Sequence, residues 1–446
     1  MEHHAAATTA VFGLNPMWIA TALLVLTYAA VISERINRAI VALLGAGLMI
    51  VLGVLNQERA VAGVDFNTIG LLIGMMMIVS VVRRSGLFEF LAIWSAKKVK
   101  ASPAGILLML QIVTAVVSAF LDNVTTVLLV VPVTFVICER LKVKPYPFLV
   151  AQVIASNIGG TATLIGDPPN ILIGSLVGLD FNQFVVNLSP VIIVIQVVVS
   201  AIVHVLWGRT LVAAAEDRAK VMAFNEHEAI KDHGLLKKSL IVMAAVLVGF
   251  VSARFLGLEP ATIALLGAAV LLLLDCFGKP AEEQSQVVTH TFTECEWITI
   301  FFFVGLFIVI SGVESTGLLA ILANKLVEAT GGDLATTAIA ILWASAILSA
   351  IIDNIPFVAT MIPMIKAMAP TFGGPEGLMP LWWALSLGAC LGGNGTLIGA
   401  SANLTVAGMA ERAGIHFGFL KYTKTAFPIM LITVAISHAY IAWRYL

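Results

Sequence analysis

The chain has 446 residues, of which 60% are hydrophobic and only 11% are charged, and its net charge is −1. Because a typical soluble domain has about 25% charged residues, this composition excludes a water-soluble fold and predicts an all-α polytopic membrane protein in the lipid bilayer. The sequence has no basic tail or basic-aromatic patch, so nucleic acid is not expected as a partner.

Five apolar runs in the first half are long enough to span, or nearly span, a bilayer core about 30 Å thick. They cover residues 17–32, 36–55, 66–82, 148–178 and 184–207. Residues 104–140 are also apolar, but the pair Asp122-Asn123 interrupts them. The amphipathic segment 86–100 is expected at the membrane interface. A charged cytoplasmic loop over 209–237 ends this half.

The second half repeats this plan. Its apolar runs cover 238–256, 260–275, 297–313, 381–411 and 423–443, with an interfacial segment at 316–329 and an interrupted run at 334–369. A constant offset of 231 residues aligns Asp122-Asn123 with Asp353-Asn354, and an offset of 233 aligns Gly159-Gly160 with Gly392-Gly393. The sequence therefore predicts an internal duplication, with repeat 1 over 16–208 and repeat 2 over 238–446.

Residues 104–140 and 334–369 are interpreted as re-entrant hairpins, with each Asp-Asn pair at a tip, and 148–178 and 381–411 as broken helices. Each half then crosses the membrane five times, and because five is odd, the two halves must be inverted relative to one another. With the N-terminus outside, 20 of the 25 Lys and Arg residues fall on the inner side. This bias agrees with the positive-inside rule.

Polar and helix-breaking residues at membrane depth are costly unless they line a cavity or bind something. We therefore expect the two tips and the two glycine-rich runs to converge on one transport site, with the glycine runs unwound. The alternative for the glycines is close packing at a helix crossing. The candidate substrate- and ion-binding residues are Asp122, Asn123, Thr125, Thr126, Gly159, Gly160, Thr161, Thr163, Asp167, Asn170, Asp353, Asn354, Gly393, Asn394, Thr396 and Asn403.

Asp122 and Asp353 are the leading candidates for proton coupling, because ionisable side chains at membrane depth commonly form proton pathways. The alternative is that each only caps a half-helix. Asp167 is a third candidate; repeat 2 has Ala400 in its place, and a turn aspartate is the alternative. Cys390, two residues before Gly392, is a candidate contact for As(III) or Sb(III), or else a small packing residue.

The sequence contains no GxxxxGK[ST] loop for ATP, so we expect transport to use an ion gradient, with no cofactor and no enzymatic activity. Two candidate partners remain: a cytoplasmic ATPase subunit that docks on 209–237, and a second copy of this chain in a homodimer.

The four motifs resemble the ArsB/NhaD group of the ion-transporter superfamily, which includes arsenite permeases, sodium/proton antiporters and the P protein. They are an Asp-Asn pair, Gly-Gly-Thr-Ala-Thr-Leu-Ile-Gly-Asp-Pro-Pro-Asn, Asp-Asn-Ile-Pro and Gly-Gly-Asn-Gly-Thr-Leu-Ile-Gly-Ala-Ser-Ala-Asn. The resemblance covers nearly the whole chain and implies an elevator-type carrier. The related divalent anion/sodium symporters have serine at the tips, where this chain has Asp122 and Asp353, which disfavours a dicarboxylate substrate.

The leading hypothesis is therefore proton-coupled efflux of arsenite or antimonite across the plasma membrane, the inner membrane of the cell. Both substrates are mostly neutral trihydroxides at neutral pH, which amide and hydroxyl groups can recognise. A sodium/proton antiporter is the alternative, and transport of an anion such as a dicarboxylate or chloride is a third.

Overall fold

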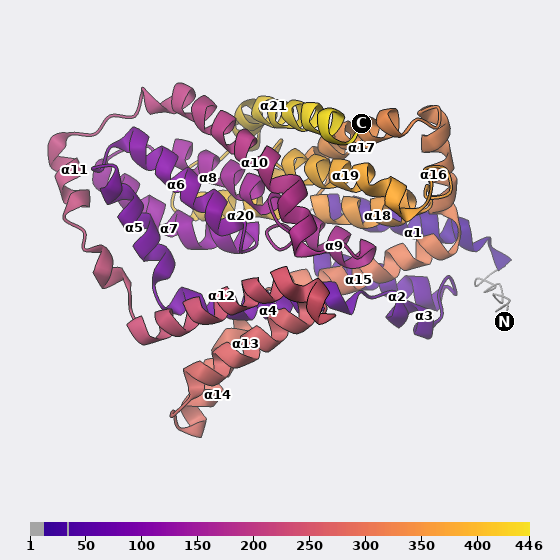
Figure 1. Cartoon of the computed structure of the whole chain (residues 1–446), viewed down its shortest axis with the longest axis horizontal. Coiled ribbons are helices and arrows are strands. Elements are labelled where there is room, and N and C mark those ends of the chain that lie inside the picture. The colour runs from indigo at the N-terminus through magenta and orange to yellow at the C-terminus, as the bar shows by residue number, and fades with distance from the viewer. Residues whose placement is uncertain (1–12, 34) are drawn as a thin grey trace.

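The computed structural model describes residues 13–33 and 35–446, and these residues form α-helices, short 3-10 or π turns and loops, with no strand among them (Figure 1). Seven helices are long and apolar enough to cross a membrane, and five shorter ones are also apolar. The expectation of an all-α polytopic membrane protein is confirmed.

The first half contains ten helices that follow the predicted order. They are α1 (Pro16–Ile32), α2 (Arg38–Val51), α3 (Gln57–Ala62), α4 (Phe66–Arg84), α5 (Leu87–Lys98), α6 (Pro103–Ser118), α7 (Asn123–Leu141), α8 (Tyr146–Thr161), α9 (Pro168–Val177) and α10 (Phe181–Val203). The last continues into the π turn η2 (His204–Gly208), so the apolar stretch runs over Phe181–Gly208.

The second half contains the remaining helices, after the connecting α11 (Ala215–Met222) and η3 (Glu226–Ala229). They are α12 (His233–Leu256), α13 (Pro260–Cys276), α14 (Ala281–Thr293), α15 (Trp297–Ser315), α16 (Leu318–Ala329), α17 (Leu334–Ile351), α18 (Asn354–Lys366), α19 (Met379–Gly392), α20 (Ser401–Arg412) and α21 (Phe419–Tyr445), with 3-10 turns η4 (Pro375–Leu378) and η5 (Leu397–Gly399).

Elements of the two halves correspond in position as well as in order. The bounds of α4 and α5 become those of α15 and α16 when 231 is added. The segments interpreted as hairpins are helix pairs in both halves, α6 with α7 and α17 with α18, each turning at an Asp-Asn pair. Of these four helices, α7 and α17 are also long enough to span a membrane by themselves. The re-entrant course of the hairpins therefore stays a prediction.

The two halves exchange helices: each half has one helix that packs against a helix of the other half. Helix α2 of the first half packs against α15 of the second, and α13 of the second half packs against α4 of the first. Both crossings depend on a glycine: a Cβ added at Gly305 would lie 2.5 Å from the carbonyl carbon of Ala42, and one at Gly74 would lie 2.6 Å from that of Ala264. Since no side chain fits in that space, the backbones approach closely, as at small-residue crossings in membrane proteins.

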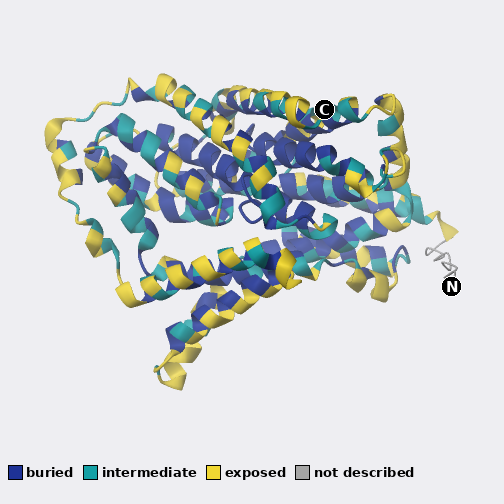
Figure 2. Ribbon diagram, viewed as in Figure 1, coloured by how far each residue is buried: buried dark blue, intermediate teal, exposed yellow. Residues whose placement is uncertain are grey.

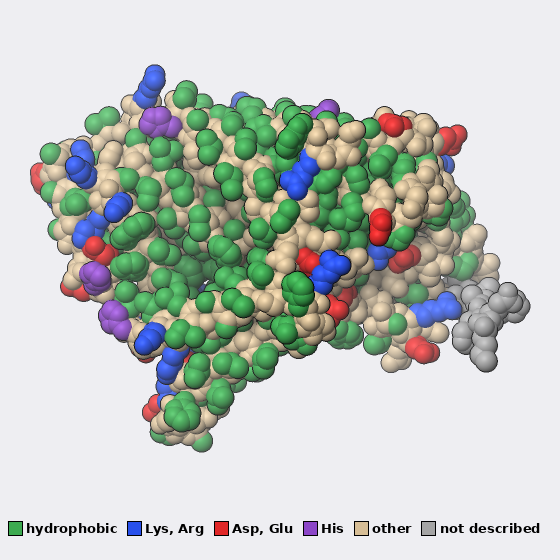
Figure 3. Space-filling model, viewed as in Figure 1, with side chains coloured by type: hydrophobic (Ala, Val, Ile, Leu, Met, Phe, Trp, Pro, Cys, Tyr) green, Lys and Arg blue, Asp and Glu red, His purple; other side chains and the backbone are tan. Residues whose placement is uncertain are grey.

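Helices α8 and α19 form the centre of the molecule, and every residue after the first in each of them is buried (Figure 2). Longer helices such as α10, α12 and α21 surround them and have many exposed apolar side chains. Figure 3 shows hydrophobic side chains over much of the visible face, as expected of a lipid-facing surface. The predicted inner segments α5 and α11 lie at one end of the long axis, and the predicted outer α3 and α16 lie at the other (Figure 1).

The region between the halves differs from the predicted loop. Helix α12 begins at His233, inside the predicted loop 209–237, because Asp232 caps it by accepting a hydrogen bond from the amide of Leu235 at 2.9 Å. The preceding residues fold back onto α5: Lys97 Nζ donates to the carbonyl of Phe224 at 3.0 Å and pairs with Glu226. The bridge from Lys97 lowers the pKa of Glu226.

Candidate functional site

Each predicted hairpin tip is a helix start with an aspartate cap. Asp122 accepts a hydrogen bond from the amide of Thr125 at 2.8 Å, and Asp353 accepts one from the amide of Ile355 at 3.0 Å. The capping alternative is therefore observed at both tips. Each carboxylate has a second oxygen left for other partners.

We expected the chain to be unwound at both glycine pairs, but the unwound segments begin later in the sequence. In the first half, α8 stays helical through Gly159, Gly160 and Thr161, and the chain leaves helical geometry over 162–167. In the second half, α19 ends at Gly392, and the unwinding begins at Gly393. The expectation that 159–161 are unwound is wrong.

The structural reason is that Gly159 and Gly392 are packing positions. A Cβ at Gly159 would lie 2.0 Å from the carbonyl oxygen of Ala115 on α6, and one at Gly392 would lie 2.4 Å from that of Ala346 on α17. These glycines let α8 and α19 contact the first helix of each predicted hairpin, which is the alternative raised from the sequence.

A buried amide network joins the two halves behind the tips. Asn123 Nδ2 donates to Asn157 Oδ1 at 3.0 Å, and Asn157 Nδ2 donates to Asn394 Oδ1 at 2.9 Å and to Asn403 Oδ1 at 3.0 Å. All four side chains are at most 3% exposed. These hydrogen bonds link α7, α8 and the second unwound segment, while Asn394 Nδ2 is buried without a hydrogen-bond partner among the described residues.

Each unwound segment is held by an asparagine and a threonine. Asn170 Nδ2 donates to the carbonyls of Thr161 and Thr163, and Asn403 Nδ2 donates to those of Gly393 and Thr396. The hydroxyls of Thr163 and Thr396 donate to carbonyls at the two tips, Ala119 and Ala350, each at 2.5 Å. These side chains satisfy backbone groups that lack helical partners.

Cys390 occupies the position in repeat 2 that Asn157 occupies in repeat 1, since 157 plus the offset of 233 is 390. Its thiol donates to Asn170 Oδ1 at 3.6 Å, as Asn157 donates to Asn403. The hydroxyl of Ser386 also donates to Asn170 Oδ1, at 2.6 Å. Cys390 is 0% exposed, and its observed role is to help orient Asn170.

Both predicted tips meet at a small cavity of about 20 Å³, which we call the central cavity. This volume is enough for about one water molecule. Its polar and charged lining residues come from both halves of the chain: Arg38, Asp122, Asn123, Asp167, Glu296, Thr299, Asn354 and Ser401. Asp122 and Asn354 come from opposite tips.

Asp167 does not act as a helix cap, although it precedes α9. Its carboxylate is fully buried and faces the other half, where Asn354 Nδ2 donates to Oδ1 at 3.5 Å. Oδ2 is buried without a partner in hydrogen-bond geometry among the described residues, with the Cys390 thiol close by. A buried carboxylate oxygen in this situation needs a partner such as a proton, a water molecule or an ion.

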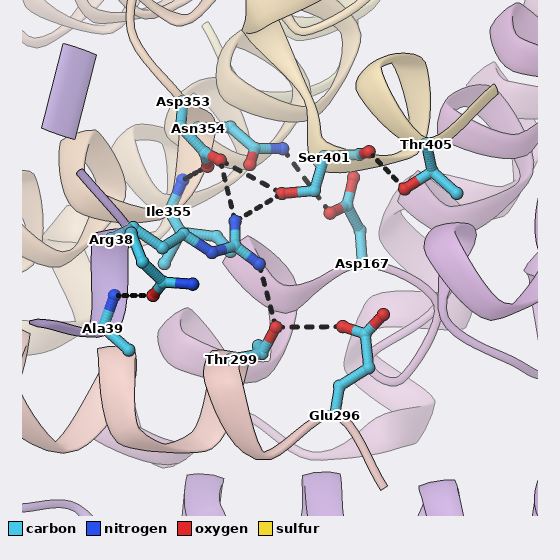
Figure 4. Close-up of polar contacts among 11 residues, drawn as sticks. Arg38, Ala39, Asp167, Glu296, Thr299, Asp353, Asn354, Ile355, Ser401 and Thr405 are labelled. Carbon is cyan, nitrogen blue, oxygen red and sulfur yellow. Dashed lines mark hydrogen bonds and ion pairs between the residues drawn. The ribbon is translucent and has the colours of Figure 1, made fainter. Parts of the chain in front are cut away.

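Arg38, the first residue of α2, links the central cavity to a larger one (Figure 4). Its Nη1 donates to Ser401 Oγ at 2.6 Å and lies 3.4 Å from Asp353 Oδ2, and its Nη2 donates to Thr299 Oγ1 at 2.8 Å. Thr299 in turn donates to Glu296 Oε2 at 2.9 Å. One guanidinium group thus connects α2, α15, α18 and α20.

The larger cavity, which we call the vestibule, has a volume of about 300 Å³. Arg38 and Ser401 line both cavities, while Asp353, Asn37 and Thr405 line the vestibule alone. A third cavity of about 90 Å³ lies on the other side of Glu296 and is lined by Thr125. The vestibule leads to the end of α1 and the start of α2, which are predicted on the inner side.

Of the predicted residues, Asp122, Asn123, Asp167, Asn354, Asp353 and Thr125 line these cavities. The others surround the cavities. Five side chains donate to backbone carbonyls: Asn170, Asn403, Thr161, Thr163 and Thr396. Asn394 accepts from Asn157, the glycines allow close packing, and the hydroxyl of Thr126 is buried without a hydrogen-bond partner among the described residues. Arg38, Glu296, Thr299, Ser401 and Asn157 were missed. Two of them carried a signal in the sequence: Asn157 is an amide inside an apolar run, and Ser401 lies inside the second glycine-rich motif.

Two helix-exchanged halves, two capped tips and a charged cavity at their meeting point define a multi-pass membrane transporter, not an enzyme. The model of the citrate transporter family matches residues 28–388, and the chain belongs to this family. Its bacterial relatives place it in the plasma membrane.

Similar proteins agree with this class. An uncharacterized transporter of Mycobacterium bovis is 42% identical over 96% of this chain and 98% of its own length. The P protein of Homo sapiens is 33% identical over 95% of this chain and 59% of its own length. The crystal structure of the YdaH transporter of Alcanivorax borkumensis has a TM-score of 0.62 at 13% identity, covering 97% of this chain and 99% of that one. The last shows a shared fold.

Proposed function

We propose that the chain is a proton-coupled secondary transporter that exports arsenite or antimonite. The observation that carries this proposal is the central cavity, where both Asp-Asn tips meet Asp167 and Glu296. Three carboxylates and one guanidinium line it. Buried ionisable groups at membrane depth are costly and are typically retained for ion or proton transfer.

The central cavity and the vestibule differ in the size of the ligand that each can hold. The central cavity, at about 20 Å³, fits a proton carrier or a single small ion. The vestibule, at about 300 Å³, is large enough for a small solute and presents Ser401, Thr405 and Asn37 to its hydroxyl groups. We propose that the trihydroxide is bound there. We assign its recognition to these groups instead of Cys390, whose thiol is fully buried and donates to Asn170.

The family is described as citrate transporters. In this chain, Asp353 lies in the vestibule and Asp122, Asp167 and Glu296 lie just behind it, with Arg38 as the single basic residue in either lining. Like charges at close range disfavour binding of a multiply charged anion. The charge of the site therefore supports a neutral or cationic substrate.

An elevator movement is supported by how the helices pack. The exchanged pairs α2/α15 and α4/α13 form one set of contacts, and the two tips with α8, α9, α19 and α20 form another. We propose that the first set is the scaffold and the second set moves. Arg38, on α2, would then hold the moving tip at Asp353 and Ser401 in this conformation and release it when the tip moves.

The test uses purified chain reconstituted alone in liposomes. A pH gradient is expected to drive arsenite uptake, measured by mass detection of arsenic, and Asp122→Asn and Asp353→Asn are each expected to abolish it. Both replacements keep the helix caps, because asparagine caps as well as aspartate. Wild-type uptake in both variants, or uptake of citrate in place of arsenite, would refute the proposal. A strict ATP requirement would instead indicate a docked ATPase subunit.

A sodium/proton antiporter is the second candidate. It is favoured by the size of the central cavity, which admits a single ion, and by its surplus of carboxylates, which are oxygen ligands suited to hard cations. A sodium gradient should then move protons across the same liposomes without arsenite, as read by an internal pH dye. Sodium-driven proton movement without arsenite transport would select this function.

A further inference from the structure

A separate cavity of about 560 Å³ shares no lining residue with the central cavity and lies between the start of α8, the turn η2 after α10 and the start of α21. We call it the basic cavity. Lys142, Lys144 and Lys421 line it together with Tyr146, Trp207 and Thr425, and none of its lining residues in the described chain is acidic. The transport site uses none of these residues.

Two of the three lysines are available to an anion. Lys142 pairs with Asp217 at 3.3 Å, and that carboxylate also pairs with Lys220. Lys144 is exposed and makes no ion pair within the described part of the chain. Lys421 Nζ lies 3.8 Å from the centre of the Tyr146 ring, which orients its charge at the cavity without neutralising it.

Tyr146 is held rigidly and presents an unused hydroxyl group. Its ring packs against Phe417, with centroids 5.3 Å apart, and edge-on against Trp207 at 6.5 Å. Its Oη is buried and has no partner in hydrogen-bond geometry among the described residues, although Thr425 lies beside it. Tyr146 lines the same cavity as Lys144 and Lys421, and a phenol and ammonium groups are donors suited to phosphate oxygens.

The surroundings of the basic cavity are apolar and exposed. Val205, Leu206 and Val212 are 66%, 46% and 78% exposed, and they flank Trp207 and the cavity rim. By the distribution of basic residues, the ends of α7 and α10 and the starts of α8 and α21 are predicted on the inner side. Tryptophan and tyrosine commonly lie at this depth, between headgroups and acyl chains.

We propose that the basic cavity binds the headgroup of an anionic phospholipid from the inner leaflet. Lys144 and Lys421 contact the phosphate, Tyr146 Oη donates to it, and the acyl chains lie along Val205 and Leu206. Basic pockets between membrane helices on the cytoplasmic side are suited to such headgroups. A bound lipid would connect α8, which carries Asn157, to α10 and α21.

The test is native mass spectrometry of the purified full-length chain in detergent, titrated with phosphatidylglycerol or phosphatidylcholine. We expect phosphatidylglycerol to bind more tightly, and the double variant Lys144→Ala/Lys421→Ala to weaken it roughly fivefold for each lysine removed. Tyr146→Phe, which keeps the ring, should weaken it further without loss of melting temperature. Lys98→Ala/Lys237→Ala removes the same charge elsewhere on the predicted inner side and should change nothing.

Equal binding of the two lipids, or equal loss in the control variant, would refute the proposal. A competition experiment with millimolar inorganic phosphate distinguishes a lipid site from a site for soluble anions. If it displaces phosphatidylglycerol completely, the cavity is a site for soluble anions and the lipid assignment is wrong. If it displaces none, the apolar rim contributes as proposed. Both results are independent of whether the chain transports arsenite.

Discussion

At the scale of residues, the site depends on one arginine, Arg38, whose position in the sequence indicates only an ordinary charge at the membrane interface. Arg38 falls at the edge of an apolar run, where a basic residue usually marks the inner side. In the structure its guanidinium bonds Ser401 and Thr299 and pairs with Asp353, from 261 to 363 residues away in sequence. No local pattern encodes such contacts, because they arise only when the two halves exchange helices.

Replacing Arg38 is expected to impair transport more than it impairs folding. Arg38→Gln removes hydrogen bonds to a charged group, each contributing about 1.5–3 kcal/mol, which corresponds to roughly ten- to hundredfold in the population of this conformation. The initial rate of arsenite uptake in liposomes should fall by at least about tenfold. Arg35→Gln, an exposed neighbour, is the matched control. An unchanged rate for Arg38→Gln would contradict the role assigned to it.

Asp167 permits a sharper test of proton coupling, because it is not needed as a helix cap. Asp167→Asn keeps the side-chain size and the contact with Asn354 but cannot exchange a proton. Uptake of arsenite should then no longer respond to the pH gradient, which is measured by comparing rates with and without it. Asp333→Asn, at the exposed start of α17, should retain the full response. A retained response in Asp167→Asn would assign coupling to Asp122 or Asp353.

At the scale of elements, the sequence located the interruptions but assigned the wrong cause to one of them. The tips at Asp122 and Asp353 are turns with caps, as the residue types indicate. The glycines of the first run are helical instead of unwound, because α8 needs them to contact α6. Glycine permits both unwinding and close packing, so its presence alone does not choose between them.

The packing role of Gly159 predicts a loss of stability. Gly159→Ala would place its Cβ 2.0 Å from the carbonyl oxygen of Ala115, and a main-chain neighbour cannot move aside as a side chain can. We expect overpacking of about 1–3 kcal/mol, seen as a lower midpoint of thermal unfolding in detergent. Gly47→Ala on α2, where no atom lies within 4 Å of the added carbon, is the control. Equal midpoints would show that α6 and α8 can separate at little cost.

At the scale of the whole molecule, the duplication predicted the correspondence of the halves but not how they interlock. The exchange of α2 and α13 between halves, and the meeting of the two tips at one cavity, are tertiary facts. Helix α14 was not expected, because its run contains too many polar residues to suggest a membrane span. The inverted orientation stays a prediction from the odd number of crossings.

That orientation is testable with single cysteines, because the four native cysteines are all buried. Lys237→Cys and Lys325→Cys introduce exposed thiols at sites predicted to lie inside and outside. In intact cells, a membrane-impermeant maleimide should label the second and not the first, and permeabilised cells should label both. Labelling of Lys237→Cys alone in intact cells would reverse the topology. Labelling of both would contradict the three crossings predicted between the two sites, over 238–256, 260–275 and 297–313.

The sequence by itself determined the membrane class, the helical content, the duplication and half of the polar side chains that line the central cavity, because these follow from composition, periodicity and local residue types. The tertiary structure alone decided which polar groups line the cavities and which hold the backbone. It brought Arg38 to Asp353, turned Asp167 toward Asn354, and left Asn170 and Asn403 to satisfy carbonyls. These outcomes depend on where two halves of one chain meet, and each half encodes only its own side of that contact.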